Sequence, residues 1–209
     1  METSVVATWL EDARPDGRLR VSGATLRVSR ATAALLKHRH RIIGSRVTMA
    51  GDDDVVLRLS VEELVVGVRE GFLALSALHD RGGVSIDVVS TLCGIVDAPD
   101  TETSDALDMD PADRLRVRVF ADLWRRGFFV AHGSKFGVDF LIYDADPDTC
   151  HARVLVLVKE WTAGFGTVDI VTHCRLAKMV NKEIHFASAR PDGSIAYVSL
   201  EHALLSARH

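Results

Sequence analysis

Residues 133–143, with the sequence GSKFGVDFLIY, join a glycine-rich turn to a short apolar strand that ends in a tyrosine. Gly133 and Gly137 favour a tight turn, because glycine adopts backbone conformations that other residues avoid. The turn does not have the spacing of a nucleotide-binding loop, since no Gly-Lys-Ser/Thr follows. The run DADP after Tyr143 is expected to end the strand, because aspartate and proline are typical turn residues. The segment therefore predicts a turn, a strand over 140–143 and a second turn.

Strand and helix patterns continue on both sides of this segment. Asp110 and Pro111 predict a helix start, because aspartate caps a helix and proline suits its first position. Gly127 is expected to end that helix. The remaining C-terminal elements are expected to be strands at residues 128–130, 152–158, 183–189 and 195–200, and a helix at 167–180.

The N-terminal part predicts a smaller unit of mixed strands and helices. Ser60 and Glu63 have the spacing of a capping box, so a helix is expected over 61–70. Alternating or apolar segments predict strands at residues 24–28, 41–49 and 72–75, and a helix-prone segment lies at 31–36.

Three regions follow from these patterns. We expect an α/β N-terminal module over 1–79 and an α/β C-terminal domain over 111–209. Residues 80–110 lie between them and are rich in aspartate and glutamate after Val96. Acidic segments with few large apolar residues are usually solvated, so we expect an exposed acidic linker.

Composition indicates an ordinary globular protein. The 209 residues are 47% hydrophobic and 26% charged, and their net charge is −4. The apolar runs are too short to cross a bilayer, and residues 1–11 lack the pattern of a signal peptide, so no membrane contact is expected. The three cysteines are scattered, which favours reduced thiols over a disulfide framework and shows no zinc spacing.

Tyr143, His151 and Lys182 are the candidate catalytic residues. Each alone has an ordinary structural explanation: a strand-end anchor, a hydrogen-bonding histidine and a cation near a helix C-terminus. Together they match the needs of RNA cleavage by the 2′-hydroxyl. That reaction requires a base, an acid and a positive group near the phosphate. A nearby lysine is expected to lower the pKa of the Tyr143 phenol.

A metal-dependent nuclease is the competing chemistry. Restriction-type nucleases place an acidic residue two positions before a strand lysine. Leu157 occupies that position relative to Lys159, and Glu160 follows the lysine instead. We therefore expect no metal and no cofactor. The cationic run 37–41 is interpreted as solvated surface in preference to a phosphate contact.

The C-terminal half resembles the tRNA-splicing endonuclease family over roughly residues 114–205. The resemblance is closest to the eukaryotic subunit that cuts the 3′ splice site, and a weaker likeness extends to residues 59–77. The segments that carry it are residues 126–143, Asp146-Pro147, His151-Ala152, Arg175-Leu176-Ala177, Lys182 and 191–200.

This resemblance implies a mixed-sheet nuclease domain in which Tyr143 is the base, His151 the acid and Lys182 the transition-state stabiliser. The products would carry a 2′,3′-cyclic phosphate and a 5′-hydroxyl. In the family a helix arginine clamps a bulge nucleotide together with a residue near the C-terminus. Arg175 and His202 occupy those places here, and histidine stacks more weakly than the usual aromatic.

The resemblance also implies partners and a compartment. The substrate would be precursor tRNA, and the eukaryotic enzyme is a nuclear assembly of two catalytic and two structural subunits. Three alternatives stay open: a structural subunit of the same assembly, an archaeal-type homo-oligomer, and a protein that binds or cleaves another RNA. Retention of all three polar residues argues against the structural subunit.

Overall fold

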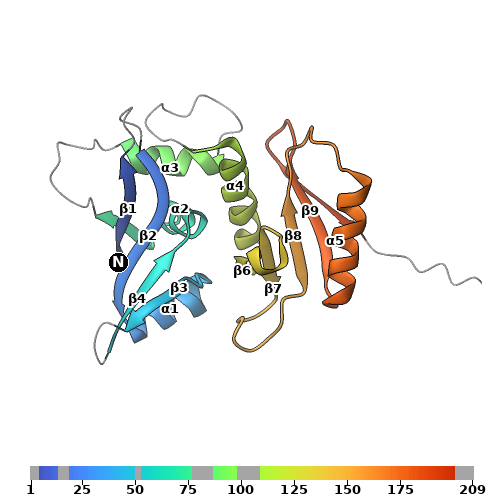
Figure 1. Cartoon of the computed structure of the whole chain (residues 1–209). Helices are drawn as coiled ribbons and strands as arrows, with labels where there is room; N and C mark the ends of the chain where they lie inside the picture. The colour runs from blue at the N-terminus through green and yellow to red at the C-terminus, as the bar shows by residue number, and fades with distance from the viewer. Residues whose placement is uncertain (1–4, 14–18, 50–52, 77–86, 98–108, 201–209) are drawn as a thin grey trace, which may run out of the picture.

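The computed structural model describes residues 5–13, 19–49, 53–76, 87–97 and 109–200. The chain forms two five-stranded sheets, and helix α4 (Pro111–Arg125) lies between the N-terminal elements and the C-terminal sheet (Figure 1). No helix within these ranges has the length and apolar character needed to cross a membrane. The expected mixed α/β class is confirmed.

The N-terminal sheet has the strand order β3-β4-β2-β1-β5, with one parallel pair between β1 and β5. Helix α1 (Arg30–His40) is capped by the Ser29 side chain, and α2 (Val61–Arg69) begins with the expected capping box of Ser60 and Glu63. The strands are β1 (Val5–Ala13), β2 (Leu19–Ser29), β3 (Ser45–Met49), β4 (Asp54–Leu59) and β5 (Leu73–Ser76).

Part of the expected acidic linker is a helix. Helix α3 (Asp87–Asp97) lies against α2 and α4, and Leu92 and Ile95 are buried in the N-terminal core. The linker prediction is therefore wrong for these residues, because two apolar side chains three positions apart form one buried helical face. The rest of the expected linker up to residue 108 lies outside the described residues, and the division into domains stays a prediction.

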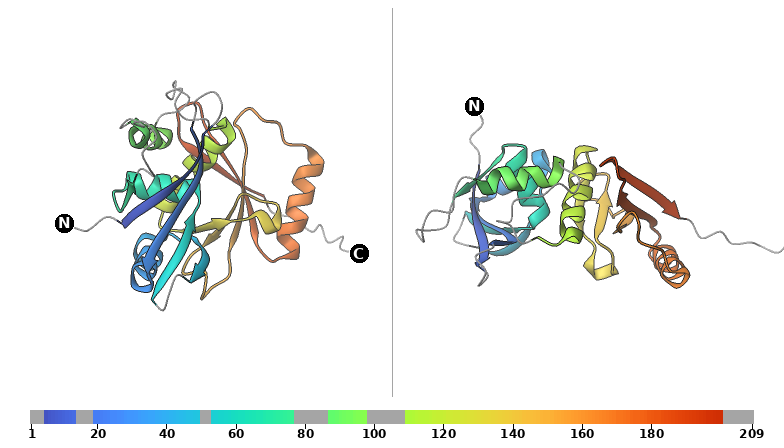
Figure 2. Two further views of the ribbon diagram at one scale, coloured as in Figure 1. Left: turned by 60° about the vertical axis from the view of Figure 1, so that its left-hand side comes forward. Right: turned by 90° about the horizontal axis from the view of Figure 1, so that it is seen from above.

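The C-terminal sheet follows the order of the chain, β10-β9-β8-β7-β6. Neighbouring strands are antiparallel except β8 and β9, which are parallel and joined through helix α5 (Thr167–Met179). One face packs against α4 and the other against α5 (Figure 2). The strands are β6 (Phe129–His132), β7 (Phe140–Tyr143), β8 (Val154–Val158), β9 (Glu183–Ala189) and β10 (Ile195–Leu200).

The glycine-rich segment forms the expected tight turn between β6 and β7. Residues Ser134–Phe136 make one turn of 3-10 helix, and Gly137 has φ of 65°, a left-handed conformation that favours glycine. At Gly133 a side chain would not fit, because an added Cβ would lie 2.3 Å from Val138 Cγ2.

Helix α4 joins the two halves through specific contacts. The indole Nε1 of Trp124 donates to the His40 carbonyl at 2.7 Å, and the Arg41 guanidinium donates to the Trp124 carbonyl at 3.0 Å. The Phe72 ring stacks on His40, with ring centroids 4.1 Å apart. Val66 of α2 is buried in the same core as α4 and the C-terminal sheet. The two sheets therefore share packing through this helix.

Candidate active site

Strand register brings the ends of β7, β8 and β9 together. Ile142 lies opposite Val154, which in turn lies opposite Glu183. One position further along, the Arg153 amide donates to the Ile142 carbonyl at 2.8 Å, and the Glu183 amide donates to the Arg153 carbonyl at 3.0 Å. The segments that carry Tyr143, His151 and Lys182 therefore meet at one end of the C-terminal sheet, although they are distant in the sequence.

Lys182 reaches the segment that carries His151. Helix α5 ends just before it, with Asn181 in the left-handed conformation at φ of 52° and the Lys182 amide bonded to the Ala177 carbonyl at 2.9 Å. The Lys182 ammonium donates to the carbonyl of Ala152 at 2.5 Å. Ala152 directly follows His151, so the lysine lies against the backbone beside the histidine.

His151 lies in the connection that precedes β8. Its side chain is exposed, whereas the next residue, Ala152, is buried against the α5 side of the sheet. The backbone is thus fixed at Ala152 while the imidazole is open to solvent. A side chain that exchanges a proton with a large substrate must be accessible in this way.

Tyr143 is partly buried at the end of β7, where it packs beside the core between the sheet and α5. Burial, followed by the neighbouring Cys150, raises the pKa of its phenol above the ordinary 10.0. The expected lowering of this pKa by a lysine is therefore wrong for this structure. The Lys182 ammonium is hydrogen-bonded to the Ala152 carbonyl, and burial disfavours the phenolate.

The loop between Tyr143 and His151 is organised around Asp146. Its carboxylate accepts a hydrogen bond from the Asp148 amide at 2.9 Å. Its carbonyl accepts from the amides of Thr149 and Cys150, at 2.9 and 3.2 Å. These local hydrogen bonds turn the chain back toward β8 and so fix where His151 lies in the connection before that strand.

Helix α1 of the N-terminal half holds this loop through ion pairs. The Lys37 ammonium lies 2.8 Å from Asp146 and 2.5 Å from Asp148, and His38 Nδ1 lies 3.2 Å from Asp146. The Lys37 and Asp146 side chains are only 17% and 16% exposed. The hydrogen bond from Lys37 is the main cause that lowers the pKa of Asp146. The interpretation of Lys37 as solvated surface is therefore wrong, and the sequence held no signal that its partners lie across the molecule.

Of the two expected RNA-binding residues, the structure describes only one. Arg175 is exposed on α5, seven positions before Lys182, as the helical spacing predicts. His202 lies outside the described residues. The proposed clamp therefore has one exposed member at the Lys182 end of α5, where a bound RNA could reach it.

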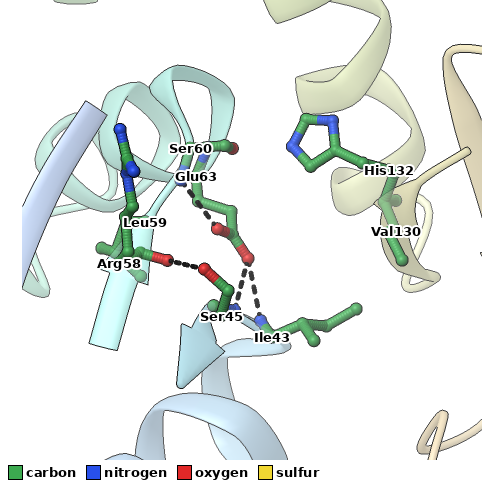
Figure 3. Close-up of a pocket in the computed structure, with 10 residues that line it drawn as sticks. Ile43, Ser45, Arg58, Leu59, Ser60, Glu63, Val130 and His132 are labelled. Carbon is green, nitrogen blue, oxygen red and sulfur yellow. Dashed lines mark hydrogen bonds between the residues drawn. The ribbon is translucent and has the colours of Figure 1, made fainter. Parts of the chain in front are cut away.

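A cavity of about 370 Å³ lies between the N-terminal elements and β6. Glu63 is buried at its wall, and its carboxylate accepts from the amides of Ile43, Gly44 and Ser60 at 2.8–3.0 Å (Figure 3). Burial raises the pKa of Glu63. Because three backbone amides already bond this carboxylate, it acts as a structural anchor. In the described part of the chain, no three His, Cys, Asp or Glu side chains gather as a metal site.

Comparison with known proteins finds matches within the C-terminal half. The family described as "tRNA intron endonuclease, catalytic C-terminal domain" matches residues 114–197, a range that contains Tyr143, His151, Arg175 and Lys182. Two curated relatives named tRNA-splicing endonuclease subunit Sen34, from Mus musculus and Homo sapiens, are each 39% identical to this chain over 95 residues. A tRNA-splicing endonuclease from Methanopyrus kandleri is 36% identical over 77 residues.

Each match covers less than half of this chain and less than half of the relative. The Mus musculus match covers 46% of this chain and 30% of the relative, and the Homo sapiens match covers 46% and 31%. The Methanopyrus kandleri match covers 37% and 43%. The chain thus spans about a third of the length of the Sen34 proteins that it matches. The C-terminal half of this chain is therefore similar to the tRNA intron endonuclease catalytic domain family over residues 114–197.

Proposed function

We propose that this chain is a catalytic subunit of a tRNA-splicing endonuclease, which cleaves precursor tRNA at an intron boundary. The observation that carries the proposal is the convergence of the Tyr143, His151 and Lys182 segments at one end of the C-terminal sheet. The family match over the same residues supports it.

The proposed reaction needs no external nucleophile. Tyr143 takes the proton of the 2′-hydroxyl, whose oxygen forms a bond to the adjacent phosphorus. The bond between phosphorus and the 5′-oxygen breaks, and His151 gives its proton to that leaving oxygen. Lys182 stabilises the negative charge on the phosphoryl oxygens in the transition state. The products are a 2′,3′-cyclic phosphate and a 5′-hydroxyl, and no metal takes part.

The raised pKa of Tyr143 constrains this mechanism. At neutral pH the phenolate is a minor form, so the base acts through a small ionised fraction or after bound RNA has changed its surroundings. The Lys182 ammonium is positioned on the neighbouring backbone and can turn toward a phosphate that enters beside His151. The three groups therefore act together only when the substrate lies between them.

Substrate placement is proposed by analogy with the matched relatives. Arg175, with His202, would hold a bulge nucleotide of the precursor tRNA. The likeness to Sen34 supports cleavage at the 3′ splice site, a hetero-oligomer with other splicing subunits, two catalytic and two structural, and a nuclear location.

Cleavage of an intron-containing precursor tRNA tests the proposal. The chain is assayed alone and with co-purified subunits, in excess EDTA, and the new ends are analysed. We expect a 2′,3′-cyclic phosphate and a 5′-hydroxyl at the 3′ splice site. The proposal fails if the triple variant Tyr143→Phe, His151→Ala, Lys182→Ala cleaves as fast as the unsubstituted chain, which is the result expected of a structural subunit.

An archaeal-type homo-oligomer is a second candidate, because the Methanopyrus kandleri relative matches the same domain. It predicts that the chain alone is active and self-associates. Sedimentation of the purified chain, with cleavage measured on the same fractions, separates the two assemblies. An unrelated hairpin RNA serves as the control substrate.

A further inference from the structure

A second cavity of about 590 Å³ lies in the N-terminal half beside the loop that precedes His151. Its wall is formed by α1, β3 and β4, together with Asp148 of that loop. Helix α1 and the connection between β7 and β8 come from opposite halves of the chain and meet through the Lys37 ion pairs (Figure 1). The cavity therefore borders the loop that leads from Tyr143 to His151.

The cavity wall is cationic. Arg30, Lys37, His38 and Arg46 line it, and Asp148 is the one carboxylate among its lining residues. Lys37 pairs with both Asp146 and Asp148, so its one positive charge offsets part of the negative charge of the loop there. Arg30 and Arg46 are exposed, and within the described part of the chain their side chains form no hydrogen bond or ion pair. Their charges face solvent across the cavity.

All charged side chains in the segment of sequence that forms most of the cavity wall are positive. Residues 17–51 contain eight lysines and arginines and no aspartate or glutamate, in a chain whose net charge is −4. The C-terminal half alone has only a weak excess of positive charge. The strongest uniform block of positive charge thus belongs to the half that lacks the candidate catalytic residues.

We propose that this cavity binds the phosphate backbone of the RNA substrate next to the cleaved bond, with Arg30 and Arg46 as the phosphate contacts. The inference rests on the proposed function, because it assumes that RNA occupies the neighbouring active site. Exposed arginines bind phosphate oxygens in a bidentate manner, and such contacts fix the position of the RNA without reading its sequence.

The test measures binding of an intron-containing precursor tRNA to the full chain carrying His151→Ala, so that cleavage does not interfere. Adding Arg30→Gln and Arg46→Gln should weaken binding about tenfold or more at ~0.15 M salt, and should lower the slope of log affinity against log salt by about two. The lysine pair, Arg30→Lys with Arg46→Lys, should stay within about threefold, because charge carries most of the effect.

Arg58→Gln is the matched control. Arg58 is an exposed arginine of β4 in the same sheet, and it lines the cavity around Glu63 instead. Its replacement should leave the affinity and the salt slope unchanged. Equal affinities for this control and the double glutamine variant overturn the inference. If the glutamine variant melts at a lower temperature, charge reversal with Arg46→Glu alone must still weaken binding, or the inference is wrong.

Cleavage by the unsubstituted chain, measured in parallel, separates the two proposals. Absence of cleavage with intact subunits counts against the proposed function. Normal cleavage with RNA binding that ignores Arg30 and Arg46 counts against the cavity alone. If the double variant keeps its RNA affinity but loses co-purified subunits, the cavity binds a protein partner and the inference is overturned.

Discussion

The two sheets differ in how they use their polar side chains. In the C-terminal sheet, backbone pairing of β7, β8 and β9 brings Tyr143, His151 and Lys182 to one end. In the N-terminal half, α1 turns Lys37 outward to hold the loop before His151. The difference shows that the candidate catalytic residues lie in the domain that matches the family, while the preceding half holds the loop that leads to His151.

The largest effect should come from the C-terminal sheet itself. Replacement His151→Ala should lower the single-turnover cleavage rate about a thousandfold, which is within the contribution of a positioned proton donor. The control is His173→Ala, since His173 lies on α5 and bonds the Asp169 carbonyl instead. A loss of similar size in both variants would show that the C-terminal half is merely sensitive to any histidine replacement.

The raised pKa of Tyr143 predicts how the residual cleavage of the His151→Ala variant depends on pH. In the His151→Ala chain, residual cleavage should rise about tenfold per pH unit between about pH 7 and 9, because only the phenolate fraction limits the rate. Burial raises this pKa above 10.0, so the rise should not level off within that range. Rates are corrected for hydrolysis of RNA without protein. Adding Tyr143→Phe should remove the rise in rate with pH. A residual cleavage rate that does not change with pH in the His151→Ala chain would argue against a phenolate base.

Asp146→Ala tests the contact between the two halves. We expect the free energy of unfolding to fall by about 2 kcal/mol, as for loss of hydrogen bonds to a charged group, and cleavage to slow about tenfold. Urea denaturation and single-turnover rates measure both. Asp148→Ala is the control, because Asp148 shares the Lys37 partner but is 82% exposed, and it should change stability by less than ~0.5 kcal/mol.

The same ion pair makes a prediction about acid. The pKa of Asp146 is lowered in the folded chain, so its stabilisation is present above the unfolded value near 3.8 and is lost as the pH falls through the lower folded value. The difference in stability between the unsubstituted chain and Asp146→Ala should therefore shrink below about pH 4. A constant difference would mean that the carboxylate charge is not what stabilises the loop.

The smallest effect should come from the packing of α4. Trp124→Phe removes the indole donor to the His40 carbonyl and should cost about 1 kcal/mol of unfolding free energy. Trp161→Phe is the control, because Trp161 is 50% exposed. An equal and negligible cost for both variants would mean that α4 joins the halves by apolar contact alone.

Elements with local signals were predictable from the sequence. Strands β7, β9 and β10 were predicted with the bounds that the structure gives, and the caps at Asp110 and Ser60 located α4 and α2. Strands β1 and β4 were missed; β1 pairs with the neighbouring β2 and the distant β5, and β4 pairs with the neighbouring β3 and with β2. Helix α3 was missed because acidic residues nearby outweighed the apolar pair Leu92 and Ile95.

The candidate site was predictable in its residues and not in its contacts. Tyr143, His151 and Lys182 could be named because their chemistry and their order resemble a known family, and their roles stay a prediction. The bond from Lys182 to the Ala152 carbonyl depends on the parallel register of β8 and β9. The pair Lys37–Asp148 joins residues 111 positions apart, which only the packed chain brings together.

The neighbour-to-neighbour order of the C-terminal sheet has a consequence for biosynthesis. Each strand from β7 to β10 pairs with the strand made just before it, so this sheet can grow as the ribosome adds residues. The N-terminal sheet places β1 between β2 and β5, so one edge of its first strand stays unpaired until residue 76 has emerged. The half that is synthesised first is thus the slower to close.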